Sequence, residues 1–223
     1  MALAAAAVAD GTRTVVVTPH VHPAHITDPT EIAEHVHVLS GRLEGEQIEL
    51  SLLPGGELEH SMVERLSQRD LSLIAHGPLG RRWLLVEAPF DGLGDSFTAA
   101  TDELRARGFG VVVAHPERAE PSRSTDAALE HELACGSAFQ LTASSLTGAN
   151  GDSIRAAALR LLAAAPLAVI ASDAHGLHRM PALRRAVAAL AAAEVADPQR
   201  FAGAAPRRLL EHGLAPGLPA IAA

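Results

Sequence analysis

Short aliphatic runs alternate with helix-like segments along almost the whole sequence. Six runs are rich in the residue types that favour strands: Thr14–Thr18, Ile48–Leu53, Trp83–Val86, Gly110–Ala114, Ala138–Thr142 and Leu167–Ala171. Segments with helical spacing lie between most of them: Pro29–Leu39, His60–Leu66, Phe97–Arg107, Thr125–Ala134, Ser153–Ala164 and Ala182–Ala193. This alternation predicts parallel βα units, arranged as an open sheet or as most of a barrel.

The length and composition fit one domain of this α/β class. The 223 residues suit a single large unit, because α/β barrels often fill that length. Hydrophobic residues make up 48% of the chain and aromatic residues only 3%, so the core must consist of Ala, Val, Leu and Ile. We expect a domain over residues 1–212, followed by a loose tail over residues 213–223 that is rich in Pro, Gly and Ala.

Charge, apolar pattern and cysteine content indicate where the protein acts and which classes of partner are excluded. No long uncharged apolar stretch occurs, so we expect no membrane span. We read the short apolar start, Met1–Ala7, as a helix rather than a signal peptide. The single cysteine, Cys135, cannot form an internal disulfide, which favours the cytoplasm. The net charge of −8 argues against broad nucleic-acid binding.

Side chains that can bind metal ions follow five of the six aliphatic runs. These side chains are His20, Glu57, Glu87, His115, Asp173 and His175. In barrels the active site lies at the carboxyl ends of the strands, so we expect these residues to converge. Mixed imidazole and carboxylate ligands suit Mn, Fe, Co or Zn. Six ligands exceed the needs of one catalytic ion, so we expect two or three ions, which can activate a water for displacement at phosphorus.

Two arginines lie close to these residues in the sequence. Arg118 follows His115 by three residues, and Arg179 follows His175 by four. A guanidinium group can hold phosphate oxygens through two parallel hydrogen bonds. Either residue alone would be read as a surface arginine. Beside a metal cluster, we expect both to bind phosphate.

Six motifs in this order carry a family resemblance. They are Thr18-Pro19-His20, Gly55-Gly56-Glu57, Leu84–Glu87, Ala114–Arg118, Leu141–Gly148 and Ala171–His175. Together they resemble the PHP (polymerase and histidinol phosphatase) class of metal-dependent phosphatases. The resemblance is greatest to the protein-tyrosine phosphatases of bacterial capsule and exopolysaccharide operons, and it extends from about Ala4 to Leu210.

The resemblance implies a fold, a cofactor and a substrate. The fold is a distorted, TIM-like (β/α)7 barrel with a trinuclear metal site that is often filled by manganese. Its ligands would be the six residues named above, and its phosphate-binding residues would be Arg118 and Arg179. The implied substrate is phosphotyrosine on a bacterial tyrosine kinase that controls polysaccharide synthesis.

One feature of the family is not found in this sequence. Family members begin with a strand that ends in His-x-His, whereas Met1–Ala9 resembles the helix that comes after it. The resemblance therefore implies that the first strand is missing and that phosphatase activity is impaired. An unpaired sheet edge also invites association, so we expect copies of the chain to form homo-oligomers.

Two other His-x-His sequences occur. His35 and His37 lie in a helix-like segment, where residues two apart point about 200° away from each other and cannot share a metal ion. His20 and His22 lie at a strand end, so His22 is a candidate additional ligand. The remaining histidines are expected to be surface or locally bonded residues: His25, His60, His76, His131, His178 and His212.

Three functions remain open at this stage. The Thr142–Leu146 element, Thr-Ala-Ser-Ser-Leu, favours a phosphotyrosine phosphatase. The same metal site would also suit a histidinol-phosphate or other small-molecule phosphatase. The missing first strand leaves room for a third function, a domain that binds a phosphorylated partner without cleaving it.

Overall fold

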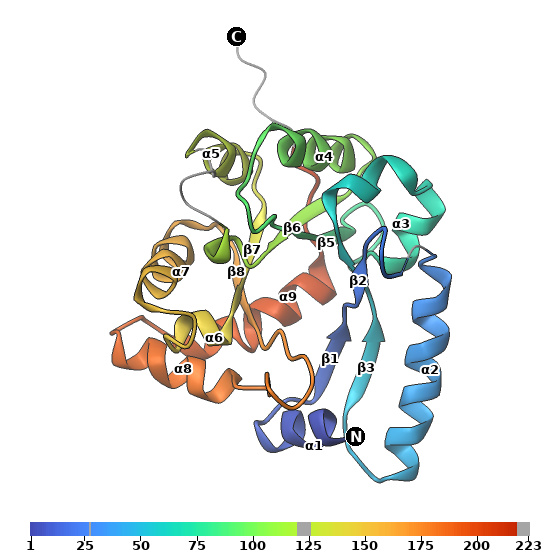
Figure 1. Ribbon diagram of the computed structural model, residues 1–223, viewed down its shortest axis with the longest axis vertical. Helices are drawn as coiled ribbons and strands as arrows, with labels where there is room; N and C mark the ends of the chain where they lie inside the picture. Colours follow the sequence, from blue (N-terminus) through green and yellow to red (C-terminus); the bar gives the residue numbers. More distant parts are fainter. Residues whose placement is uncertain (27, 120–125, 218–223) are drawn as a thin grey trace.

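The computed structural model describes residues 1–26, 28–119 and 126–217 and shows a curved, fully parallel sheet surrounded by helices (Figure 1). The strands are β1 Thr14–Val17, β2 His20–Val21, β3 Ser51–Pro54, β4 Glu57–Leu58, β5 Trp83–Glu87, β6 Gly110–Ala114, β7 Ala138–Thr142 and β8 Ala168–Ala171. β1 pairs with β3, and the other strands follow the order β2-β4-β5-β6-β7-β8. The predicted parallel α/β architecture is confirmed.

The first two predicted strands are each followed by a break and a short further strand. β1 and β2 flank Thr18 and Pro19, and β3 and β4 flank Gly55 and Gly56. Backbone hydrogen bonding continues across both breaks, because the Gly55 N–H donates to the Val17 carbonyl (3.0 Å) and the Glu57 N–H donates to the Pro19 carbonyl (3.0 Å). A Cβ at position 56 would lie 2.9 Å from the Val21 side chain, so the bend requires glycine. Six of the described strands thus match the predicted runs, and the short strands β2 and β4 lie beyond them.

Helices cover the outer face of the sheet. The α-helices are α1 Ala2–Ala9, α2 Thr30–Gly45, α3 Gln68–Ile74, α4 Asp95–Ala106, α5 Asp126–Ala134, α6 Ala143–Leu146, α7 Asp152–Ala164, α8 Leu183–Ala192 and α9 Ala204–His212. Three short 3₁₀ helices are η1 His60–Arg65, η2 Pro116–Arg118 and η3 Pro198–Phe201. The predicted helix at residues 60–66 is therefore a 3₁₀ helix, and the helix predicted to end at Leu39 continues to Gly45.

The inner face of the sheet packs against α9. The side chains of Trp83, Leu85 and Val112 form a second hydrophobic cluster with Leu209 of α9. The indole N–H of Trp83 also donates to the Leu209 carbonyl at 2.9 Å. α9 therefore closes one end of the sheet interior, and the carboxyl ends of the strands lie at the other.

The described strands do not close into a barrel. Within the described ranges, β1 pairs only with β3 and β8 pairs only with β7. A cavity of about 1070 Å³ lies beside both edges, and Val15, Val17, Val169 and Leu209 are among its apolar lining residues. Both edges therefore carry backbone groups that could pair with a further strand.

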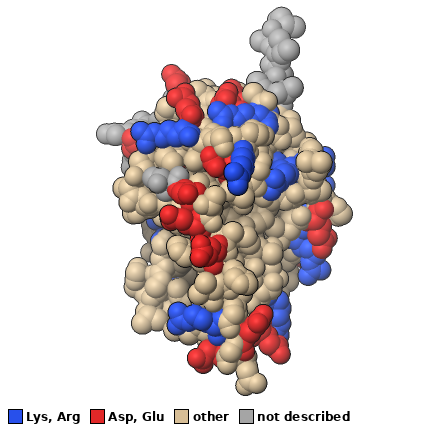
Figure 2. Space-filling view, turned by 90° about the vertical axis from the view of Figure 1, so that its right-hand side faces the viewer, with Lys and Arg blue, Asp and Glu red and all other residues tan. Residues whose placement is uncertain are grey.

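Two sequence expectations concern the termini and the membrane. After α9, the Leu214 N–H donates to the Arg81 carbonyl (2.9 Å), and residues 218–223 of the expected tail lie outside the described part. Thr125, at the start of one predicted helix, also lies outside it. Among the described helices, none has the length and apolar character needed to cross a bilayer. On the face shown in Figure 2, the coloured acidic and basic side chains are interspersed.

Candidate active site

Four of the predicted ligands meet at the carboxyl ends of neighbouring strands. His20 of β2 lies beside Glu57 of β4 in the parallel register, and Glu87 ends β5 next to His115 after β6. The His20 Nδ1 atom lies 3.4 Å from Glu87 Oε2 and 4.0 Å from Glu57 Oε2. His115 Nε2 lies 2.9 Å from Glu57 Oε1 and 3.9 Å from Glu87 Oε1. Each imidazole thus faces both carboxylates.

The close contacts between imidazoles and carboxylates shift the pKa values of His20, His115 and Glu87. The hydrogen bond to Glu87 raises the pKa of His20, and the nearby carboxylates outweigh the effect of partial burial. Burial lowers the pKa of His115, but its hydrogen bond to Glu57 outweighs this and the net shift is upward. Burial also raises the pKa of Glu87, but the two histidines reverse this and the net shift is downward. The Glu87 carboxylate thus stays ionised, which favours binding of a cation.

Asp173 joins the two arginines to this cluster. Its Oδ2 atom accepts hydrogen bonds from Arg118 Nη1 and Arg179 Nη1, each at 3.0 Å. His175 Nδ1 lies 3.4 Å from the other carboxylate oxygen of Asp173. The rings of His20 and His175 are 5.9 Å apart, centroid to centroid. The structure therefore brings all six predicted ligands and both predicted arginines into one region.

Two of these residues have strained backbones. His115 has φ 38° and Asp173 has φ 47°, both in the left-handed region. This conformation costs an L-residue roughly 1–2 kcal/mol, and such strain is concentrated at functional sites. Each residue lies just beyond a buried strand, where the chain turns away from the sheet. The turn aims both side chains at the cluster.

A buried polar network supports the loop that carries Arg118. Glu117 is almost fully buried, and its Oε1 accepts hydrogen bonds from the Thr142 N–H (2.9 Å) and the Thr142 hydroxyl (3.0 Å). Thr142 in turn shares a 2.7 Å hydrogen bond with Ser145. The His-Pro-Glu-Arg and Thr-Ala-Ser-Ser motifs thus bind each other, which fixes the position of Arg118.

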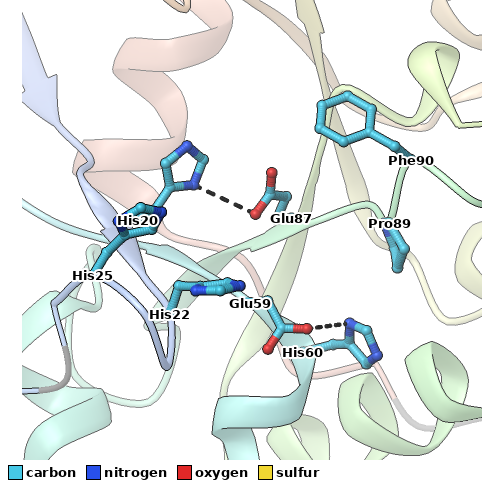
Figure 3. A pocket seen from close by; sticks show the side chains of 8 residues that line it. All are labelled: His20, His22, His25, Glu59, His60, Glu87, Pro89 and Phe90. Atoms are coloured by element: carbon cyan, nitrogen blue, oxygen red, sulfur yellow. Dashed lines mark ion pairs between the residues drawn. The ribbon is translucent and has the colours of Figure 1, made fainter.

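A cavity of about 300 Å³ opens beside the cluster (Figure 3). Its lining residues are His20, His22, His25, Glu59, His60, Glu87, Pro89 and Phe90. Sequence reasoning placed His20 and Glu87 here and kept His22 as a candidate, but it missed the others. His60 and Phe90 each lie three residues after a predicted ligand, His60 at the start of η1 and Phe90 in the loop after β5. That spacing was the available signal.

Another group with metal-ligand chemistry lies on the helical layer. Asp102 of α4, His131 of α5 and Cys135 have ligand atoms within 4.8 Å of one another. Asp102 Oδ1 already pairs with His131 Nε2 (2.8 Å) and Arg105 Nη1 (2.9 Å). Burial raises the pKa of the Cys135 thiol, so no thiolate is favoured. These contacts explain the group as part of the packing between α4 and α5.

Sequence and structure comparisons point to one set of proteins. A family model described as "Capsular polysaccharide synthesis, CpsB/CapC" matches residues 1–199. The chain is 34% identical over 184 residues to the tyrosine-protein phosphatase YwqE of Bacillus subtilis (strain 168), covering 78% of this chain and 68% of that protein. It is 28% identical over 170 residues to CapC of Staphylococcus aureus, covering 75% and 65% respectively.

A solved structure is similar along nearly the whole chain. It comes from work on YwqE of Bacillus subtilis and CpsB of Streptococcus pneumoniae, described as unique metal-dependent tyrosine phosphatases. The TM-score is 0.78 at 28% identity, and the match covers 99% of this chain and 91% of the other. The alignments to the curated relatives span about two thirds of their length.

Proposed function

The chain belongs to the CpsB/CapC family of capsular polysaccharide synthesis, and we propose that it is a metal-dependent phosphatase acting on phosphotyrosine in proteins. The observation that supports this most is the meeting of two imidazoles and two carboxylates beside Asp173 and its two arginines. Its substrate would be a bacterial tyrosine kinase that controls polysaccharide synthesis, and its place of action the cytoplasm.

The donor set fits divalent metal ions. Ligand atoms of His20, Glu57 and Glu87 lie within 4.8 Å of one another, which suits shared coordination. We assign His115, Asp173 and His175 as the remaining ligands of two or three ions. Imidazole with carboxylate favours Mn, Fe, Co or Zn, and we propose manganese. Bound ions would supply an activated water and neutralise phosphate charge.

Arg118 and Arg179 would orient the phosphate. Both now donate to one carboxylate oxygen of Asp173, as they would to a phosphate oxygen. In the reaction, water attacks phosphorus, the bond from phosphorus to the tyrosine oxygen breaks, and tyrosinate leaves. Because a phenol has a pKa near 10, tyrosinate can leave without a dedicated acid. By binding the phosphate oxygens, the two arginines would hold the phosphate in line with the attacking water.

We further propose that the open sheet is a distorted (β/α)7 barrel that a strand between β1 and β8 would complete. Two observations support this: the outer edges of β1 and β8 pair with no further strand of the described residues, and the cavity beside them is partly lined by apolar side chains. A strand there would hydrogen-bond to both edges and fill part of the cavity. Where no strand fills this place, the same edges favour association between copies of the chain.

A substrate comparison tests the proposed function. With manganese, this chain is expected to hydrolyse a phosphotyrosine peptide with a kcat/KM at least about tenfold above that for histidinol phosphate, because phenolate is the better leaving group. Both rates are measured by phosphate release. The reverse preference would identify a small-molecule phosphatase. Peptide binding without any phosphate release would identify a phospho-binding domain.

A further inference from the structure

Phe90 is far more exposed to solvent than the other Phe and Trp residues of this chain. The sequence holds five Phe, one Trp and no Tyr. The other four Phe residues and Trp83 are at most 7% exposed, whereas Phe90 is 52% exposed. Burial of Phe90 therefore adds less to the stability of the core than burial of the other five. Its position calls for another explanation.

Phe90 contacts both parts of the candidate active site. It lies three residues after Glu87 and lines the 300 Å³ cavity, where Figure 3 shows Glu87 between it and His20. Its ring stacks on the His115 imidazole, with 5.4 Å between centroids and 6° between planes. The Arg118 guanidinium carbon lies 4.8 Å from the ring centroid. Phe90 thus touches one proposed metal ligand and one proposed phosphate-binding residue.

We infer that Phe90 forms the aromatic wall of a subsite that selects aryl over alkyl phosphate esters. This inference rests on the proposed function. A phosphate held by Arg118 at the ligand cluster directs its ester group toward the cavity mouth. Phe90, whose side chain is half exposed, lines that cavity together with Pro89. Aromatic rings attract each other beyond the area they bury, so a phenyl ester gains a contact that an alkyl ester lacks.

The size of the cavity agrees with this assignment. At about 300 Å³ it lies at the small end of ligand sites, which suits one side chain more than an extended molecule. A purely structural role for Phe90, shielding His115 and holding Arg118, makes a different prediction. Replacing Phe90 would then weaken the binding of all phosphate esters equally, whatever group they carry.

Binding of two phosphonates separates the two roles without depending on turnover. Phenylphosphonate and methylphosphonate carry the same charged group and are not hydrolysed. We would measure binding by calorimetry on the manganese-loaded protein. Phe90→Ala should raise the Kd for phenylphosphonate about tenfold and change the Kd for methylphosphonate less than about twofold. Phe90→Trp should keep the preference for the phenyl compound. Leu79→Ala, at an exposed apolar residue that does not line this cavity, is the matched control and should change neither.

Kinetics provide the second readout. For a phosphotyrosine peptide, Phe90→Ala should raise KM about tenfold and leave kcat within about threefold. The inference would be overturned if Phe90→Ala weakened the binding of both phosphonates equally, or the binding of neither. A wild-type protein that prefers phenylphosphonate but releases no phosphate from the peptide would contradict the proposed function alone.

Discussion

Replacing Glu57 by glutamine is expected to lower kcat/KM for a phosphotyrosine peptide about 10²-fold or more at fixed manganese. Glu57 is 4% exposed and contacts both His20 and His115. Glutamine keeps the shape but removes the negative charge that would hold a cation, so the metal ions would bind more weakly and their positions would shift. Steady-state kinetics over a manganese titration measure both effects.

Glu59→Gln is the matched control for this change. Glu59 lines the same cavity, but its described contacts are with His60 and Ser61 rather than with the four-residue cluster. We expect its kcat/KM to stay within about threefold of wild type. If Glu57→Gln proves no more harmful than Glu59→Gln, Glu57 is not a ligand of the catalytic ions.

Adding a strand that ends in His-x-His before residue 1 is expected to raise the hydrolysis rate about 10²-fold. The added strand would pair with the free edges of β1 and β8 and fill part of the 1070 Å³ cavity. Its histidines would reach the active end of the sheet, where they would add ligands to the proposed metal site. The rate and the number of manganese ions per chain are measured together.

An added strand ending in Ala-x-Ala separates folding from catalysis. It supplies the same backbone hydrogen bonds, so it should raise the thermal unfolding temperature as the His-x-His version does, but not the rate. Equal rates for the original and the His-x-His chain would contradict the proposal. They would show that this chain completes its metal site in another way, with His22 as the first residue to mutate.

The sequence predicted the strands better than their interruptions. Aliphatic runs identify strands directly, and alternation with helices implies parallel pairing. The breaks fall at Pro19 and at Gly55-Gly56, residue types that interrupt strands, but the pairing continues beyond them through hydrogen bonds between segments that are distant in the sequence. Helix α2 extends beyond the predicted end at Leu39 to Gly45, across Gly41, a residue of low helix propensity, and Leu43 in this extension is buried.

Site residues at the ends of strands could be predicted from the sequence, whereas those further along the chain could not. Carboxyl ends of parallel strands lie on one edge, so residues such as Glu87 and His115 had to converge. Residues beyond the strand ends follow paths set by tertiary contacts: the ring of His60, at the start of η1, lies 6.2 Å from that of Phe97, and Phe90 stacks on His115. Their spacing after Glu57 and Glu87 gave a signal, but these contacts, and so their place in the cavity, are set by the folded structure.

Metal removal and restoration test the central claim most directly. The protein is stripped with a chelator, and hydrolysis of a phosphotyrosine peptide is followed as manganese is added back. We predict no turnover without metal and a return of activity as two or more ions bind per chain. Hydrolysis at the full rate by the metal-free protein would contradict the account.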